Sequence, residues 1–137
     1  MNNNISVFLG GTCNNSTWRE ALMPHLECDY FNPVVEDWTE EAQQIEIEKR
    51  NTCDFVLYVI TPKMTGVYSI AELIESSINE PHRTIFCTIY KDDENEFTEH
   101  QLKSLKMVKQ MVIKYNVRTF DNLIDIANFL NFINRPT

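Results

Sequence analysis

The chain has 137 residues, of which 12 are basic and 20 acidic, so its formal net charge at pH 7 is −8. This length suits one domain with a single core, which we expect to span residues 1–137. An acidic surface repels phosphate backbones and anionic lipid, and no apolar run reaches the length of a membrane helix, so we expect neither nucleic acid nor a membrane as a main partner.

Apolar runs alternate with helical patterns along the chain, which is typical of βαβ units around a parallel sheet. The predicted strands are Ile5–Leu9, Tyr30–Val35, Phe55–Ile60, Thr84–Tyr90 and Val117–Phe120. The predicted helices span residues 17–27, 39–52, 69–80, 99–115 and 122–133, from apolar spacing and start signals. This alternation predicts an α/β fold: one flavodoxin-like, doubly wound domain with a five-stranded parallel sheet of order 2-1-3-4-5 and helices on both faces.

Several helix starts have the spacing of a capping box, in which a short polar side chain and an acidic or amide side chain satisfy the free backbone donors. These pairs are Thr17 with Glu20, Asp37 with Glu40, Ser69 with Glu72, and Thr98 with Gln101. The acidic segment Lys91–Glu99 is predicted to be a solvated loop without a chemical role.

The cysteines are widely separated and form no CxxC pair, which favours buried, reduced thiols and a cytoplasmic location. They are Cys13, Cys28, Cys53 and Cys87. No ligands occur at zinc spacing, and we expect no metal and no cofactor.

In a doubly wound sheet, the loops that follow the first three strands converge at one edge. The first loop begins with Gly10, Gly11 and Thr12, and Trp18 and Arg19 follow on a helix. The glycines allow the backbone to approach a ligand closely, but a strand-to-helix turn accounts for them at least as well. The loop has neither GxGxxG nor GK[ST], which argues against a dinucleotide site or a P-loop.

The second loop places Asp37 beside Trp38. A partly exposed indole can stack on a base, although a tryptophan at a helix start more often packs in the core.

The third loop carries Gly66, Tyr68 and Ser69 ahead of Glu72, which is predicted in the first turn of a helix. A role in helix capping is sufficient to explain a glutamate at position 72. The alternative is a catalytic role for Glu72, because Glu46 on the preceding helix supplies a second carboxylate. Two carboxylates at one site can divide the roles of nucleophile and acid in cleavage of a glycosidic bond.

Three features occur in order along residues 5–80. They are the strand and glycine loop Val7-Phe8-Leu9-Gly10-Gly11, Glu46 eight residues before Asp54, and Gly66 followed by Glu72-Leu73. Together they resemble the nucleoside 2-deoxyribosyltransferases and their relatives, the deoxynucleoside 5′-monophosphate N-glycosidases. The family usually has Asp at the position of Glu46, and Val67-Tyr68 interrupts its run of small residues, which argues against a 5′-phosphate on the substrate.

The resemblance implies cleavage or transfer at the N-glycosidic bond of a nucleoside or nucleotide, with Glu72 as nucleophile and Glu46 as proton donor or orienting group. The residues expected to bind substrate are Gly10, Gly11, Thr12, Trp18, Arg19, Asp37, Trp38, Gly66, Tyr68 and Ser69. The sequence does not decide between transfer and hydrolysis, and it leaves a homo-oligomer open. A nucleotide-binding or sensing module without turnover and an NAD glycohydrolase are the alternatives.

Overall fold

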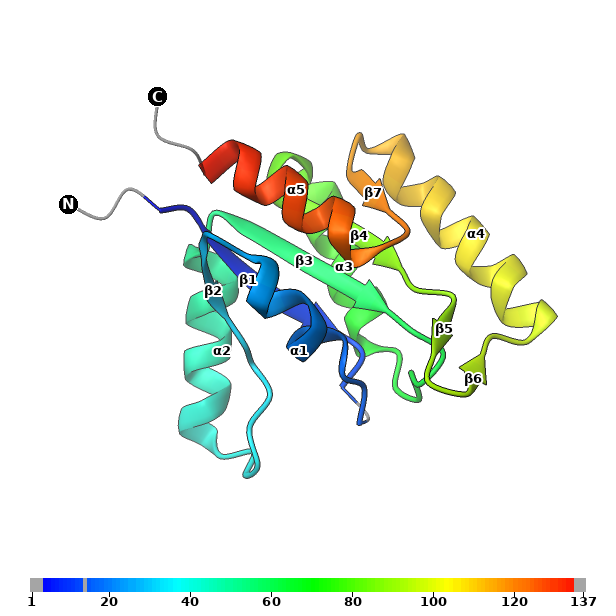
Figure 1. Cartoon of the computed structure of the whole chain (residues 1–137), viewed down its shortest axis with the longest axis horizontal. Coiled ribbons are helices and arrows are strands. Elements are labelled where there is room, and N and C mark those ends of the chain that lie inside the picture. Colours follow the sequence, from blue (N-terminus) through cyan, green and yellow to red (C-terminus); the bar gives the residue numbers. More distant parts are fainter. Residues whose placement is uncertain (1–3, 14, 135–137) are drawn as a thin grey trace.

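The structure, a computed structural model, describes residues 4–13 and 15–134. Asn14 of the expected first loop and both ends of the expected domain lie outside the described residues. The main sheet has five parallel strands in the order β2-β1-β3-β4-β7, which confirms the predicted flavodoxin-like order with β7 as the fifth strand (Figure 1). The strands are β1 (Ser6–Gly11), β2 (Asp29–Phe31), β3 (Phe55–Ile60), β4 (Thr84–Thr88) and β7 (Arg118–Phe120).

Helices cover both faces of the sheet (Figure 1). They are α1 (Trp18–Leu22), α2 (Glu40–Thr52), α3 (Tyr68–Asn79), α4 (Glu99–Lys114) and α5 (Leu123–Asn134), with short 3-10 helices η1 (Met23–His25) and η2 (Pro81–Arg83). Successive side chains of a strand point to opposite faces. Leu57 of β3 therefore packs in the cluster of α1 and α5, whereas Tyr58 packs in the cluster of α3 and α4.

The fourth strand ends at Thr88, two residues before the predicted Tyr90. Two other predicted elements are shortened further, and a proline explains each. The second strand ends at Phe31 instead of Val35, because Pro33 has no N–H to donate to a sheet ladder. The first helix ends at Leu22 and continues only as the 3-10 helix η1, because Pro24 removes a donor from the helical ladder.

Only one predicted capping box is present. The Thr98 hydroxyl accepts from the Gln101 N–H, and the Gln101 side chain accepts from the Thr98 N–H. Thr17 makes no side-chain cap, and Thr39 rather than Asp37 caps α2. Ser69 lies inside α3, which begins at Tyr68 after an N-terminal cap at Val67 without a side-chain hydrogen bond. Glu72 is therefore the fifth helical residue, beyond the first turn, and it has no capping role.

The segment predicted to be a solvated loop contains a small antiparallel hairpin of β5 (Lys91–Asp92) and β6 (Asn95–Glu96). Asp92 is buried, and its Oδ2 accepts from the Ser16 hydroxyl at 2.6 Å and from the Thr61 hydroxyl at 2.7 Å. The hairpin thereby ties together the loops that follow β1 and β3.

All four cysteines are free thiols, and three of them are buried as expected; Cys13 is exposed instead. Within the described part of the chain, no helix has both the length and the apolar character needed to cross a membrane.

Candidate active site

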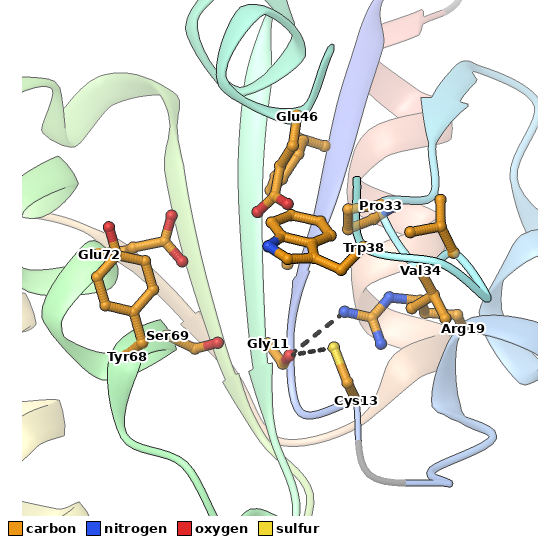
Figure 2. Close-up of a pocket in the computed structure, with 13 residues that line it drawn as sticks. Gly11, Cys13, Arg19, Pro33, Val34, Trp38, Glu46, Tyr68, Ser69 and Glu72 are labelled. Atoms are coloured by element: carbon orange, nitrogen blue, oxygen red, sulfur yellow. Dashed lines mark hydrogen bonds between the residues drawn. The ribbon is translucent and has the colours of Figure 1, made fainter. Parts of the chain in front are cut away.

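A pocket of about 310 Å³ opens where the strand order reverses, at the carboxyl ends of β1 and β3 (Figure 2). Ligands of open α/β sheets bind at this kind of position, and the volume is at the lower end of the range for small-molecule sites. The lining residues come from β1, α1, the β2–α2 loop, α2 and α3; they are Phe8, Gly10, Gly11, Cys13, Arg19, Pro33, Val34, Val35, Trp38, Glu46, Tyr68, Ser69 and Glu72.

The pocket brings together the two carboxylates that the sequence singled out. Glu46 enters from α2 and Glu72 from α3, and both carboxylates point into the pocket (Figure 2). Burial raises the pKa of Glu46, against the opposing charges of Arg50 and Arg19. Burial also raises the pKa of Glu72; Arg50 opposes this rise, while the negative charges of Glu46 and Glu75 add to it. Both groups therefore hold a proton more firmly than exposed carboxyls do.

The Glu72 carboxylate forms an ion pair with Arg50 of α2, with 3.3 Å between Nε and Oε2. Arg50 also donates from Nε to the Tyr58 hydroxyl at 2.7 Å and from Nη2 to Glu75 Oε1 at 3.3 Å. Tyr58 is fully buried, and burial raises its pKa to about 12 although the Arg50 charge acts in the opposite direction. The Arg50–Tyr58–Glu72 contacts were not predicted. The only signals in the sequence are an arginine one turn after Glu46 and a tyrosine in the otherwise apolar run of β3.

Arg19 lines the pocket, but its nitrogens are bound to the protein main chain. Nε donates to the Leu9 carbonyl at 2.9 Å, Nη1 to Thr12 at 2.8 Å and Nη2 to Gly11 at 3.3 Å. The side chain is 2% exposed, and its burial lowers its pKa. Arg19 therefore shapes the wall that β1 and its loop present to the pocket.

The two glycines expected in the first loop are the last residues of β1, and both line the pocket. Gly11 has a φ of +118°, and a Cβ there would lie 2.0 Å from the Val59 carbonyl oxygen. A Cβ on Gly10 would meet the Tyr58 ring at 3.0 Å. Position 11 therefore requires glycine, and a side chain at Gly10 would have to displace the Tyr58 ring slightly, so both residues let β1 pack closely against β3.

The β2–α2 loop forms an apolar wall opposite α3. Trp38 is 56% exposed and lines the pocket, so one face of its indole is accessible from the pocket side (Figure 2). Pro33, Val34 and Val35 extend this wall. These three residues were not predicted, because they were assigned to a strand that in fact ends at Phe31.

The remaining predicted site residues lie elsewhere. Thr12 and Gly66 line an adjoining hollow of about 150 Å³ that shares Gly11, Cys13, Tyr68 and Ser69 with the main pocket. Trp18 is buried, and its Nε1 donates to the Thr12 carbonyl at 2.8 Å. Trp18 and Asp37 line neither space. Cys13, which was not predicted as a site residue, lines both.

Another hollow, of about 420 Å³, lies between α4 and the end of β4 and has no acidic residue in its lining. The pair of acidic side chains therefore distinguishes the pocket at the switch point from this other hollow.

Across residues 4–13 and 15–134, no group of three or more His, Cys, Asp and Glu side chains is placed to hold a metal ion.

The family model described as nucleoside 2-deoxyribosyltransferase like matches residues 4–91, which is more than half of the chain. The chain belongs to this family. The matched segment contains every residue of the pocket, together with Arg50 and Tyr58. No curated protein matched the chain. Membership of the family suggests glycosyl transfer or cleavage and binding of a nucleoside or nucleotide.

Proposed function

We propose that the protein cleaves the N-glycosidic bond of a nucleoside by way of a covalent intermediate on Glu72, in keeping with its nucleoside 2-deoxyribosyltransferase-like family. One observation carries the proposal: Glu72 and Glu46, on different helices, line the same pocket. A carboxylate nucleophile divides one difficult displacement into two easier steps.

In the first step, a Glu72 carboxylate oxygen forms an ester bond to C1′ of the sugar as the bond from C1′ to the base breaks. The electron pair of that bond passes to the base nitrogen, which takes a proton from the Glu46 carboxylic acid. In the second step, a new base or a water molecule attacks C1′ and releases the Glu72 carboxylate. The Glu46 carboxylate accepts the proton that the attacking group gives up.

The surroundings of the two carboxyl groups support this division of roles. Glu72 lies against the guanidinium of Arg50, which favours its ionised form. Within the described residues, no ion pair involves the Glu46 carboxylate, and burial is the main influence on its pKa. An acid whose pKa is raised by burial is suited to donate a proton near neutral pH.

The charges around the pocket favour a nucleoside over a 5′-nucleotide. Arg19 donates to main-chain carbonyls, and Arg50 is paired with Glu72 and Glu75. The two carboxylates of the pocket repel a phosphate, whereas hydroxyl groups of a sugar bind carboxylates readily. The apolar wall and the exposed face of Trp38 suit a flat base.

The proposal is tested by measuring release of free base from a panel of ribonucleosides, 2′-deoxynucleosides, their 5′-monophosphates and NAD. We expect release from at least one nucleoside, and we expect the rate in Glu72→Gln to fall by at least about a thousandfold, because the nucleophile is lost. Glu48→Gln changes an exposed glutamate of α2 and serves as the matched control.

Three results would contradict the proposal. An unimpaired Glu72→Gln variant excludes the nucleophile. Tight binding of an intact nucleotide with no reaction across the panel favours the binding module. Release of nicotinamide from NAD, without reaction of any nucleoside, favours the glycohydrolase.

A further inference from the structure

We propose that Arg50 is a positioning residue, which holds the Glu72 side chain in the orientation for attack and is itself held by Tyr58 and Glu75. The proposal rests on the function proposed above, in which Glu72 is the nucleophile. Arg50 does not line the pocket; its contact with the nucleophile is the ion pair with the Glu72 carboxylate, and its charge also lowers the pKa of Glu46.

Arg50 contacts Glu72 at two points. Its Nε lies 3.3 Å from the carboxylate Oε2, and its Nη2 donates to the main-chain carbonyl of Glu72 at 3.3 Å. The first contact is to the side chain, and the second ties the guanidinium to the main chain of α3. A guanidinium is planar, with donors in a fixed arrangement, so the main-chain contact fixes the position from which Nε meets the Glu72 carboxylate.

The hydroxyl of Tyr58 anchors Arg50 to the central strand β3, at 2.7 Å from Nε. The Tyr58 ring is fully buried and packs against Gly10, where even a methyl group would come within 3.0 Å of it. The phenol is therefore a fixed reference point in the core. Glu75 adds a second contact on α3, but it is mostly exposed and contributes less.

The position of Arg50 matters because the other influences on Glu72 favour its protonated form. Charged and titratable groups face Glu72 from each neighbouring element: Arg50 and Glu46 from α2, Tyr58 from β3, and Glu75 on α3 itself. Burial, Glu46 and Glu75 all raise the pKa of Glu72, and the charge of Arg50 lowers it. A carboxylate must be ionised to attack, so Arg50 supports both the place and the charge of the nucleophile.

The test follows the Glu72 carboxyl directly, by NMR titration of protein labelled with ¹³C at glutamate, with Glu72→Gln used to assign the signal. In Arg50→Met we expect the pKa of Glu72 to rise. We also expect kcat/KM to fall roughly ten- to a hundredfold, with the acid limb of its pH profile moved to higher pH. Lys103→Met, on the exposed side of α4, is the control for loss of a cation and should leave the titration and the rate unchanged.

Arg50→Lys separates charge from geometry. We expect it to bring the Glu72 titration back toward that of the wild type but to recover only part of the rate, because an ammonium group cannot reproduce both contacts to Glu72. If Arg50→Met does not fold, Arg50→Gln, which removes the charge but keeps a polar side chain, should show the same rise in the pKa of Glu72.

The proposal is overturned if the folded charge-removing variant, Arg50→Met or Arg50→Gln, leaves the Glu72 titration as in the wild type. A loss of rate by the same factor at every pH would also overturn it, since that pattern indicates a general structural defect. Failure of the proposed function gives a different result: no base is released by any form of the protein, while the NMR titration still shows whether Arg50 holds the Glu72 carboxylate.

Discussion

Two arginines flank the pocket, and their partners differ in kind. Arg19, on α1, is almost fully buried and donates to the main-chain carbonyls of Leu9, Gly11 and Thr12. Arg50, near the end of α2, is partly exposed and contacts the side chains of Tyr58, Glu72 and Glu75.

The comparison separates a residue that builds the pocket wall from one that acts on a group in the pocket. The carbonyls bound by Arg19 do not titrate, so the role of Arg19 is to stabilise the end of β1 and the loop after it. The side chains bound by Arg50 carry protons, so a change at Arg50 alters the chemistry of the site. Replacing the two arginines should therefore have different consequences.

The largest effect on stability is expected for Arg19→Met. Buried carbonyls that lose their donor cost about 1 to 3 kcal/mol each, and the stacking of Arg19 on the Trp18 ring, at 4.4 Å, is also lost. We expect the free energy of unfolding in urea to fall by about 3 kcal/mol or more, and Arg19→Lys to recover only part of it. A fall of less than about 1 kcal/mol, or one no larger than that of Arg50→Met, would remove the distinction between the two regions.

An intermediate effect is expected at Tyr58, which connects Arg50 to the core. The folded protein raises the pKa of Tyr58 from 10.0 to about 12, so it holds the phenol proton more tightly than the unfolded chain does. The stability that this contributes is complete below pH 10 and is lost as the pH rises from 10 toward 12. Its full size is about 3 kcal/mol, since each pKa unit corresponds to about 1.4 kcal/mol.

Denaturant unfolding between pH 7 and pH 11.5 checks this expectation. Tyr58→Phe should lose less stability above pH 10 than the wild type does, while at neutral pH it should be about 1 kcal/mol less stable, because Arg50 loses an acceptor. Other buried acids, such as Cys28 and Cys87, are present in both proteins, so the difference between the two curves isolates Tyr58. Curves that run parallel above pH 10 would contradict the prediction.

The smallest effect is expected for Thr98→Ala, which removes the capping box of α4. The free energy of unfolding should fall by about 1 kcal/mol, with kcat/KM unchanged, because the start of α4 contributes nothing to the pocket. Thr98→Ala is therefore a reference for the other variants, because it lowers the free energy of unfolding without changing a residue of the pocket. If its activity falls as well, losses of activity at Arg50 cannot be assigned to Glu72.

Local patterns identified the elements of the fold better than their ends. The apolar run Phe55–Ile60 is a strand over the predicted residues, and the box of Thr98 and Gln101 caps α4 as predicted. Pro24 and Pro33 ended two elements early. Their effect was visible in the sequence, because a proline removes a backbone donor wherever it stands.

The candidate site was predicted in part. Glu46 and Glu72 were selected as a pair, and the structure places both in one pocket, although Glu72 lies deeper in its helix than expected. Trp18 and Arg19 were expected to contact substrate; both donate to the main chain of the first loop, and of the two Arg19 lines the pocket whereas Trp18 does not. Which side of a short helix faces the loop depends on helix rotation, and apolar spacing over five residues does not define it.

By itself, the sequence determined the alternation of strands and helices, the order of the sheet and the edge at which the first three loops meet, because these follow from periodicity and from the handedness of crossovers. Only the tertiary structure decided that Arg50 reaches Glu72 and that Tyr58 holds Arg50. Arg50 and Glu72 are 22 residues apart on different helices, and a contact of this kind depends on how two helices pack on one sheet face, which no local pattern encodes.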